Sequence, residues 1–176
     1  MSLCSSNMTY DLTPKEVIKS KNSLSQKNIT LIKALSNTLS DEIEFNEIYD
    51  HSPKKDLFYS EKNKSRSIEY FISELIDELK IERSTLILSY ISMKKLLSKS
   101  KNYLSIENFE KLFLTSCYIN SKFNEDYNCE TKIYSDVCKV STKELILLES
   151  KYCEMIDFAL FVDELSVKKY TNKKNK

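Results

Sequence analysis

Two segments decide the fold of this chain: IENFEKLFLTSCYINSKFN (106–124) and STKELILLESKYCEMIDFAL (141–160). The first is apolar nearly all round, which predicts a helix in the middle of a bundle, since such a surface needs neighbours on several sides. The second is amphipathic and opens with STKE, a capping-box pattern that starts helices. Lys122 and Glu149 are charged residues against this apolar background, and they suggest a protein-binding face more than a catalytic pocket.

Helical periodicity also extends through most of the chain before these segments. Apolar residues recur at three- and four-residue steps, as in amphipathic helices, and Ser67, Ser84 and Ser105 stand at positions suited to N-caps. A capping box at Thr13 predicts a short helix near the N-terminus, and residues 47–66 have no sustained period and are expected to be a surface connector. The other predicted helices are residues 28–46, 68–79, 84–98 and 130–137.

Composition favours a single all-α domain. The chain has 176 residues, 41% of them hydrophobic, and its 27 basic and 26 acidic residues give a net charge of +1. A near-neutral chain offers no global field for nucleic acid. The sequence contains no glycine, which excludes the glycine-dependent phosphate-binding loops and disfavours tight β-hairpins.

Nothing in the sequence indicates a catalytic site, a metal site or a cofactor. His51 is the only histidine and lies in a polar stretch next to Pro53. The five cysteines form no Cys-x-x-Cys pair, and we expect reduced thiols in a cytoplasmic or nuclear protein. No apolar run approaches the ~18 residues that a membrane span needs, so no membrane contact is expected.

Several short strings, taken in order with fitting helix lengths between them, resemble the cyclin box. The narrower likeness is to a single box of the phosphate-regulation (PHO/PCL) and plant P/U types. The strings are SIEYF (67–71), LTS (114–116) leading to SKF (121–123), DYN (126–128), VSTKEL (140–145) leading to Leu148-Glu149, and DFALFV (157–162).

The resemblance implies an all-α fold in which five helices form a cyclin box with a central third helix, preceded by an N-terminal flanking helix. The expected division has four parts. Residues 1–27 are mostly disordered with a short helix, 28–66 hold the N-terminal helix and connector, 67–162 form the cyclin box, and 163–176 form a C-terminal turn and a basic tail.

The resemblance further implies a non-catalytic subunit that binds and activates a cyclin-dependent protein kinase by docking on its C-helix. Lys122 and Glu149 match the charged residues that cyclins direct at that helix and the segment before it. Phe123, Cys153, Phe158 and Leu160 match positions that offer apolar contacts beside them. The alternative is an all-α scaffold or adaptor, or a cyclin fold used as in transcription factors, without kinase activation.

Three positions depart from the family pattern. Lys94 stands where many cyclins carry an aspartate that pairs with an arginine of the first box helix. The hydrophobic docking patch of cell-cycle cyclins is not recognisable in Ser67–Phe71, and Cys138-Lys139 replaces a pair of glycines. The first two departures argue against substrate docking of the cell-cycle type, and the third leaves the loop before the last long helix undetermined.

Overall fold

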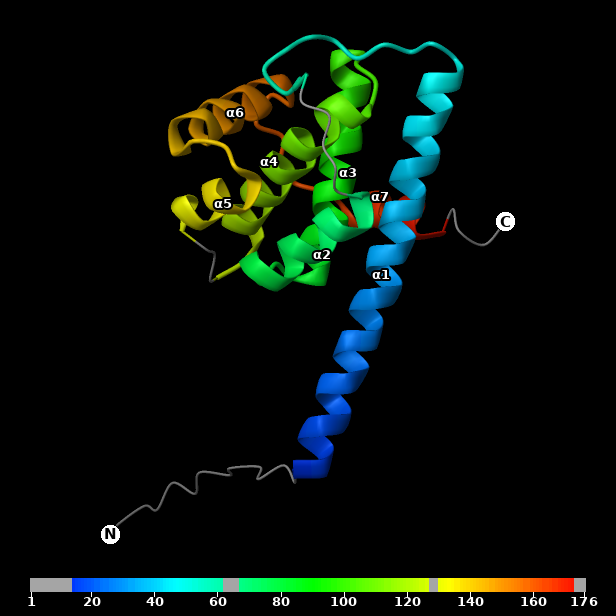
Figure 1. Cartoon of the computed structure of the whole chain (residues 1–176), viewed down its shortest axis with the longest axis vertical. Coiled ribbons are helices and arrows are strands. Elements are labelled where there is room, and N and C mark those ends of the chain that lie inside the picture. Colours follow the sequence, from blue (N-terminus) through cyan, green and yellow to red (C-terminus); the bar gives the residue numbers. More distant parts are fainter. Residues whose placement is uncertain (1–13, 62–66, 127–129, 173–176) are drawn as a thin grey trace.

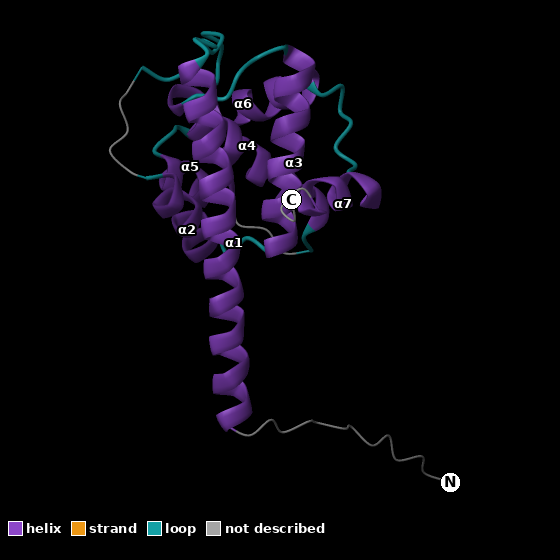
Figure 2. Cartoon of the chain, turned by 90° about the vertical axis from the view of Figure 1, so that its right-hand side faces the viewer, coloured by secondary structure: helices purple, strands orange, loops and turns teal. Residues whose placement is uncertain are grey.

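The computed structural model describes residues 14–61, 67–126 and 130–172, and every regular element in these ranges is a helix (Figure 1, Figure 2). The prediction of an all-α fold is therefore confirmed. The expected disorder of residues 1–12, the Thr13 cap, most of the 126–128 break and the basic tail lie outside the described residues. The helices are α1 (Pro14–Ile48), α2 (Ile68–Leu79), α3 (Arg83–Ser100), α4 (Ile106–Asn124), α5 (Thr131–Cys138), α6 (Thr142–Met155) and α7 (Glu164–Asn172).

Helix α4 occupies the centre of the bundle formed by α2 to α6, as its sequence predicted. It is buried at nearly every position from Asn108 to Ser121, and it packs against α3, α5 and α6. Its start is fixed locally, because the Asn108 side chain accepts a hydrogen bond of 3.0 Å from the backbone N–H of the N-cap residue Ser105. A helix covered on all sides leaves only its ends available to a partner.

Helix α6 lies beside α4 and begins where the STKE pattern placed it. The Ser141 hydroxyl accepts from the backbone N–H of Glu144 (3.1 Å), while the Glu144 carboxylate pairs with Lys111 of α4 (2.8 Å). Leu145, Leu148 and Tyr152 are fully buried, so they hold α6 against the core. The ion pair and the apolar stripe together fix the register between the two helices.

Helix α1 is one continuous helix where the sequence suggested a short helix followed by a separate one at 28–46. No proline or glycine follows Pro14 within it, so nothing in the chain stops the helix between the two expected segments. In both views its N-terminal part extends beyond the bundle (Figure 1, Figure 2). The C-terminal part packs through a buried stripe of Ile32, Leu35, Leu39 and Ile43.

Helix α3 begins before the predicted cap. Glu82, with an extended backbone, is the N-cap of α3, and Ser84 lies inside the helix and donates its hydroxyl proton to the Glu82 carboxylate (3.1 Å). The helix also runs to Ser100 rather than ending at Ser98. Ser84 lies only two residues after Glu82, and the sequence pattern favoured Ser84 because serine is the stronger N-cap residue.

The connector after α1 is anchored more deeply than a surface loop. Phe58 is fully buried and packs edge-on against the Tyr152 ring, with 6.2 Å between centroids. Its backbone N–H donates to the Asp56 carboxylate (3.0 Å), which also accepts from the Asn102 amide (3.3 Å). The prediction that residues 47–66 form a surface connector was therefore wrong at Phe58.

Lysine fills the left-handed backbone positions that glycine occupies in many proteins. Lys80, Lys101 and Lys139 cap α2, α3 and α5 with φ of 55°, 50° and 54°. At Cys138-Lys139, where the family pattern has two glycines, Lys139 thus has the left-handed backbone conformation that glycine favours. After α6, Asp157 and Phe158 also have positive φ. The chain then forms α7, a nine-residue helix where only a turn was expected.

Candidate functional site

The packing of α4 against α6 brings together the two charged residues singled out from the sequence. Lys122 lies in the last turn of α4 and Glu149 in the middle of α6, and Lys122 Nζ lies 2.5 Å from Glu149 Oε1. The side chains are 42% and 24% exposed respectively, so the pair sits at the surface edge of the interface between the helices. Both charges therefore face solvent while each is already paired.

The surroundings of Lys122 favour its charged form. Its Nζ lies 4.8 Å from the centroid of the Tyr118 ring, a cation–π distance. Partial burial works to lower the pKa of Lys122, but the hydrogen bond and charge of Glu149, together with Tyr118, outweigh it and raise the pKa above the ordinary value. The lysine is thus a fixed positive charge at neutral pH.

The four predicted apolar residues lie at the ends of the same helices, with different exposure. Phe123 follows Lys122 and is 54% exposed, and Phe158 is 70% exposed in the turn after α6. Leu160 is partly buried and packs against the core. Cys153 is half-buried one turn after Glu149, and burial first, then the Glu149 charge, raises the pKa of its thiol.

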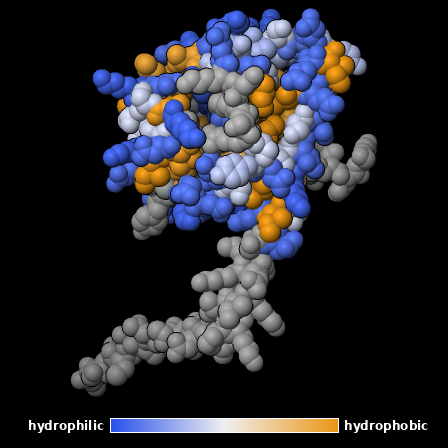
Figure 3. All heavy atoms as spheres, in the orientation of Figure 1, coloured by the Kyte–Doolittle hydropathy of each residue, from blue (hydrophilic) through white to orange (hydrophobic). Residues whose placement is uncertain are grey.

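Two further apolar residues of α6 were not singled out from the sequence. Ile146 and Leu147 are 52% and 59% exposed. Ile146 precedes Glu149 by three residues and Cys153 by seven, a spacing that places all three on one side of the helix. That spacing could have identified Ile146. The view in Figure 3 shows a largely polar surface broken by separate apolar patches.

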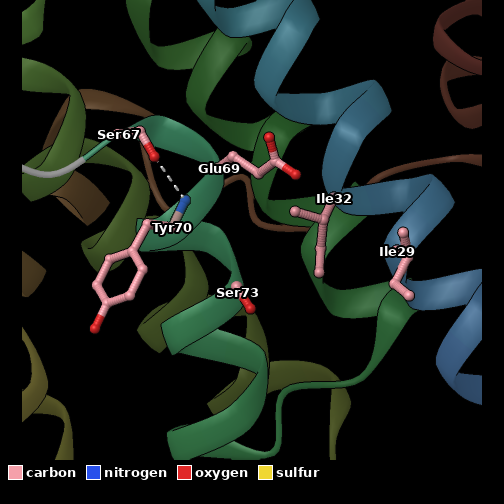
Figure 4. Close-up of a pocket in the computed structure, with 6 residues that line it drawn as sticks. All are labelled: Ile29, Ile32, Ser67, Glu69, Tyr70 and Ser73. Atoms are coloured by element: carbon pink, nitrogen blue, oxygen red, sulfur yellow. Dashed lines mark hydrogen bonds between the residues drawn. The ribbon is translucent and has the colours of Figure 1, made fainter.

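A shallow groove of about 350 Å³ lies between α1 and α2, away from this pair of helices (Figure 4). Two isoleucines of α1 and polar residues from the start of α2 line it, together with Tyr70, which is 58% exposed. Phe71 is 1% exposed and belongs to the core, so the Ser67–Phe71 segment presents no continuous apolar patch. The lining residues are Ile29, Ile32, Ser67, Glu69, Tyr70 and Ser73.

Neither a metal site nor a membrane-spanning helix is found in the part of the chain that the structure describes. No group of three or more His, Cys, Asp or Glu residues is placed there to hold a metal ion. No helix in the same ranges combines the length and apolar content needed to cross a membrane.

Burial raises the pKa of the Cys117 thiol to about 12, so this cysteine is a neutral core residue.

Comparison with known families decides the assignment. The chain matches the family model described as Cyclin over residues 8–160, most of its length, and the match falls in the phosphate-regulation and plant U-type branch. The chain belongs to the cyclin family. Cyclins are non-catalytic regulators that bind cyclin-dependent protein kinases, so this cyclin has a kinase-binding regulatory role. A search among curated proteins returned no match.

Lys94, which was singled out from the sequence as a departure from the family pattern, forms an ion pair in the structure. Lys94 of α3 pairs with Glu42 of α1, with side chains 25% and 21% exposed. The lysine that departs from the family pattern therefore ties the box to the flanking helix. A second polar contact supports the same junction, since the Asn46 amide donates to the Leu104 carbonyl (2.8 Å).

Proposed function

We propose that this cyclin activates its kinase by docking on the kinase C-helix through one surface, here called the α4–α6 face. It combines the Lys122–Glu149 pair with two exposed aromatic residues, Phe123 in the last turn of α4 and Phe158 in the turn after α6. The observation that carries the proposal is this pair, formed in the free chain with both side chains partly exposed. The face consists of Lys122, Phe123, Glu149, Cys153, Phe158 and Leu160.

Such a surface suits recognition more than stability. A partly exposed ion pair contributes little to folding, commonly below about 1 kcal/mol. At an interface, charges fix register and select the partner, while neighbouring aromatic side chains bury area and exclude water. Because Lys122 and Glu149 already hold each other, their side chains lose less freedom on binding than isolated charges would.

Activation follows from differential binding and requires no chemistry from the cyclin. A protein kinase holds ATP correctly only when a lysine of its sheet pairs with a glutamate of its C-helix. A cyclin that binds only the inward position of that helix makes the active state the populated one. Moving a kinase from about 1% to about 99% active requires roughly 5.5 kcal/mol of differential binding.

The test begins with the kinase that the full chain captures from its native cell, identified by mass spectrometry and then produced as a recombinant protein. Lys122→Glu and Glu149→Lys are each expected to weaken binding by about tenfold or more and to reduce activation in parallel. Lys168→Glu is the matched control, because it breaks a surface ion pair of 2.7 Å on α7, which Figure 1 places on the side of the bundle away from α5 and α6.

The double charge reversal, Lys122→Glu with Glu149→Lys, separates recognition from folding. It restores an ion pair within the cyclin but presents the opposite polarity to the kinase. We expect it to recover thermal stability and to remain defective in kinase binding. Full recovery of binding would show that the pair acts only inside the cyclin. Capture of no kinase, with an intact fold, would favour the scaffold alternative.

A further inference from the structure

The turn that follows α6 has an unusual backbone. The N–H of Asp157 donates to the Glu154 carbonyl (3.0 Å), and the N–H of Phe158 donates to the Cys153 carbonyl (2.8 Å). These two bonds form a Schellman motif, in which the residue after the C-cap is left-handed and is usually glycine. Asp157 takes that position here with φ 52°, and a short polar side chain tolerates it.

Phe158 is the strained residue of this turn. Its φ is 55°, a conformation in which a bulky side chain crowds its own backbone. The side chain is 70% exposed, so little core packing holds it in place. Unfavourable backbone conformations persist only where the surroundings impose them, and they gather at ligand-binding segments.

Two lysines of α3 supply these surroundings, one on each side of Phe158. Lys99 forms an ion pair with the Asp157 carboxylate, and Lys95 Nζ donates to the Ala159 carbonyl (3.0 Å). The lysines are four residues apart and therefore share one exposed face of α3. Together they fasten both neighbours of the strained residue to a helix of the core.

We propose that Lys95 and Lys99 are positioning residues that hold Phe158 in its left-handed conformation and present its ring to the kinase. The inference rests on the proposed function, because it assumes that Phe158 contacts the kinase. It adds α3 to the elements that control recognition, although these two lysines act through the turn rather than by touching the partner.

A double-mutant cycle with the recombinant kinase tests this role. Phe158→Ala is expected to weaken binding about thirtyfold. The pair Lys95→Met and Lys99→Met, which keeps the aliphatic stems, is expected to weaken binding about threefold to fivefold. In the Phe158→Ala background the same lysine changes should cost less than about twofold, because they act through the missing ring. An undiminished loss in that background would overturn the proposal.

Charge reversal gives a second, independent readout. Lys99→Glu and Asp157→Lys should each weaken binding, and the double variant should recover most of the lost affinity. Lysine is acceptable at position 157, since this chain already places lysine at left-handed C-terminal positions after α2, α3 and α5. Failure of the double variant to recover affinity, with thermal unfolding equal to that of the wild type, would also overturn it.

The outcomes separate the two proposals. If Phe158→Ala and Lys122→Glu both bind the kinase like the wild type, the α4–α6 face is wrong and this inference falls with it. If both weaken binding while the lysine changes remain additive with Phe158→Ala, the face stands and only the positioning role is refuted.

Discussion

The interface between α4 and α6 changes character from its middle to its exposed edge. In the middle, the Tyr152 hydroxyl lies 2.8 Å from Ser116 Oγ and 3.1 Å from Ser92 Oγ, and all three residues are buried. At the edge, Lys122 pairs with Glu149 in partial contact with solvent. The middle pairs the Tyr152 hydroxyl with neutral groups of the core, whereas the edge keeps charges available. The difference separates a contact that stabilises the fold from the contact that we propose for kinase recognition.

The largest expected effect is on stability, at the connector residue whose ring packs on Tyr152 in the middle of this interface. Phe58→Ala removes a fully buried ring that packs on Tyr152 and should destabilise the protein by about 3–5 kcal/mol. Urea unfolding measures it. At temperatures where the variant remains folded, its affinity for the kinase should match that of the wild type. A loss below about 1 kcal/mol would contradict the assignment of Phe58 to the core.

The same truncation at the exposed aromatic residues of the α4–α6 face should affect kinase binding instead of stability. Phe158 and Phe123 are 70% and 54% exposed, so changing either to alanine should leave the free energy of unfolding within about 0.5 kcal/mol. Each change should instead lower the free energy of kinase binding, by about 2 kcal/mol for Phe158. Isothermal titration and urea unfolding on the same samples make the comparison. Equal stability losses for Phe58→Ala and Phe158→Ala would erase the distinction between the two regions.

An intermediate effect is expected from the buried hydroxyl network. Tyr152→Phe keeps the ring but removes the hydroxyl that bonds to Ser116 and Ser92, which should cost about 1–2 kcal/mol of stability. Burial raises the pKa of Tyr152, since no charged form is stable there. The tyrosine should therefore not titrate spectroscopically below the pH at which the protein unfolds, and earlier titration would contradict its burial.

A smaller effect on stability is expected when glycine replaces a left-handed residue outside the α4–α6 face. Lys139 caps α5 with φ 54° and its side chain is exposed, so Lys139→Gly should stabilise the protein by about 0.5–1 kcal/mol. Lys151→Gly is the matched control within α6, where the same change should destabilise by about 1 kcal/mol. Kinase affinity should not change with Lys139→Gly. A stability loss at position 139 would contradict the left-handed assignment.

The smallest effect concerns the pH dependence of the edge. The pKa of Lys122 is raised in the folded state, so its contribution to stability is fully present below the ordinary lysine value and is lost as pH rises through the raised value. The difference in unfolding free energy between the wild type and Lys122→Met should therefore be constant from neutral pH to mildly alkaline pH and should shrink only in strong alkali. A change near neutral pH would show that another group titrates with it.

Local signals made much of this fold predictable. Ser67 and Ser141 cap α2 and α6 as expected, because a cap depends on residues within one turn of it. The apolar surface of residues 106–124 likewise predicted the central helix, since a surface without a polar face has few other places in a bundle.

Contacts between distant residues were harder to anticipate. Phe58 lies in a polar connector without periodicity, and only the tertiary structure shows that its ring enters the core beside Tyr152. Lys122 and Glu149 were each singled out, but their direct pairing depends on the register between two helices, which no local pattern encodes. The left-handed Phe158 could not be foreseen, because phenylalanine is among the residues least suited to that conformation.

Hydrogen exchange of the cyclin with and without its kinase is the best test of the proposed docking surface, because it locates the contact without altering the chain. We expect slower exchange on binding at the end of α4 (residues 121–125), along α6 and in the turn at 157–160. Exchange in α7 should not change. Protection confined to the groove between α1 and α2, with the α4–α6 face unchanged, would contradict the proposed docking surface.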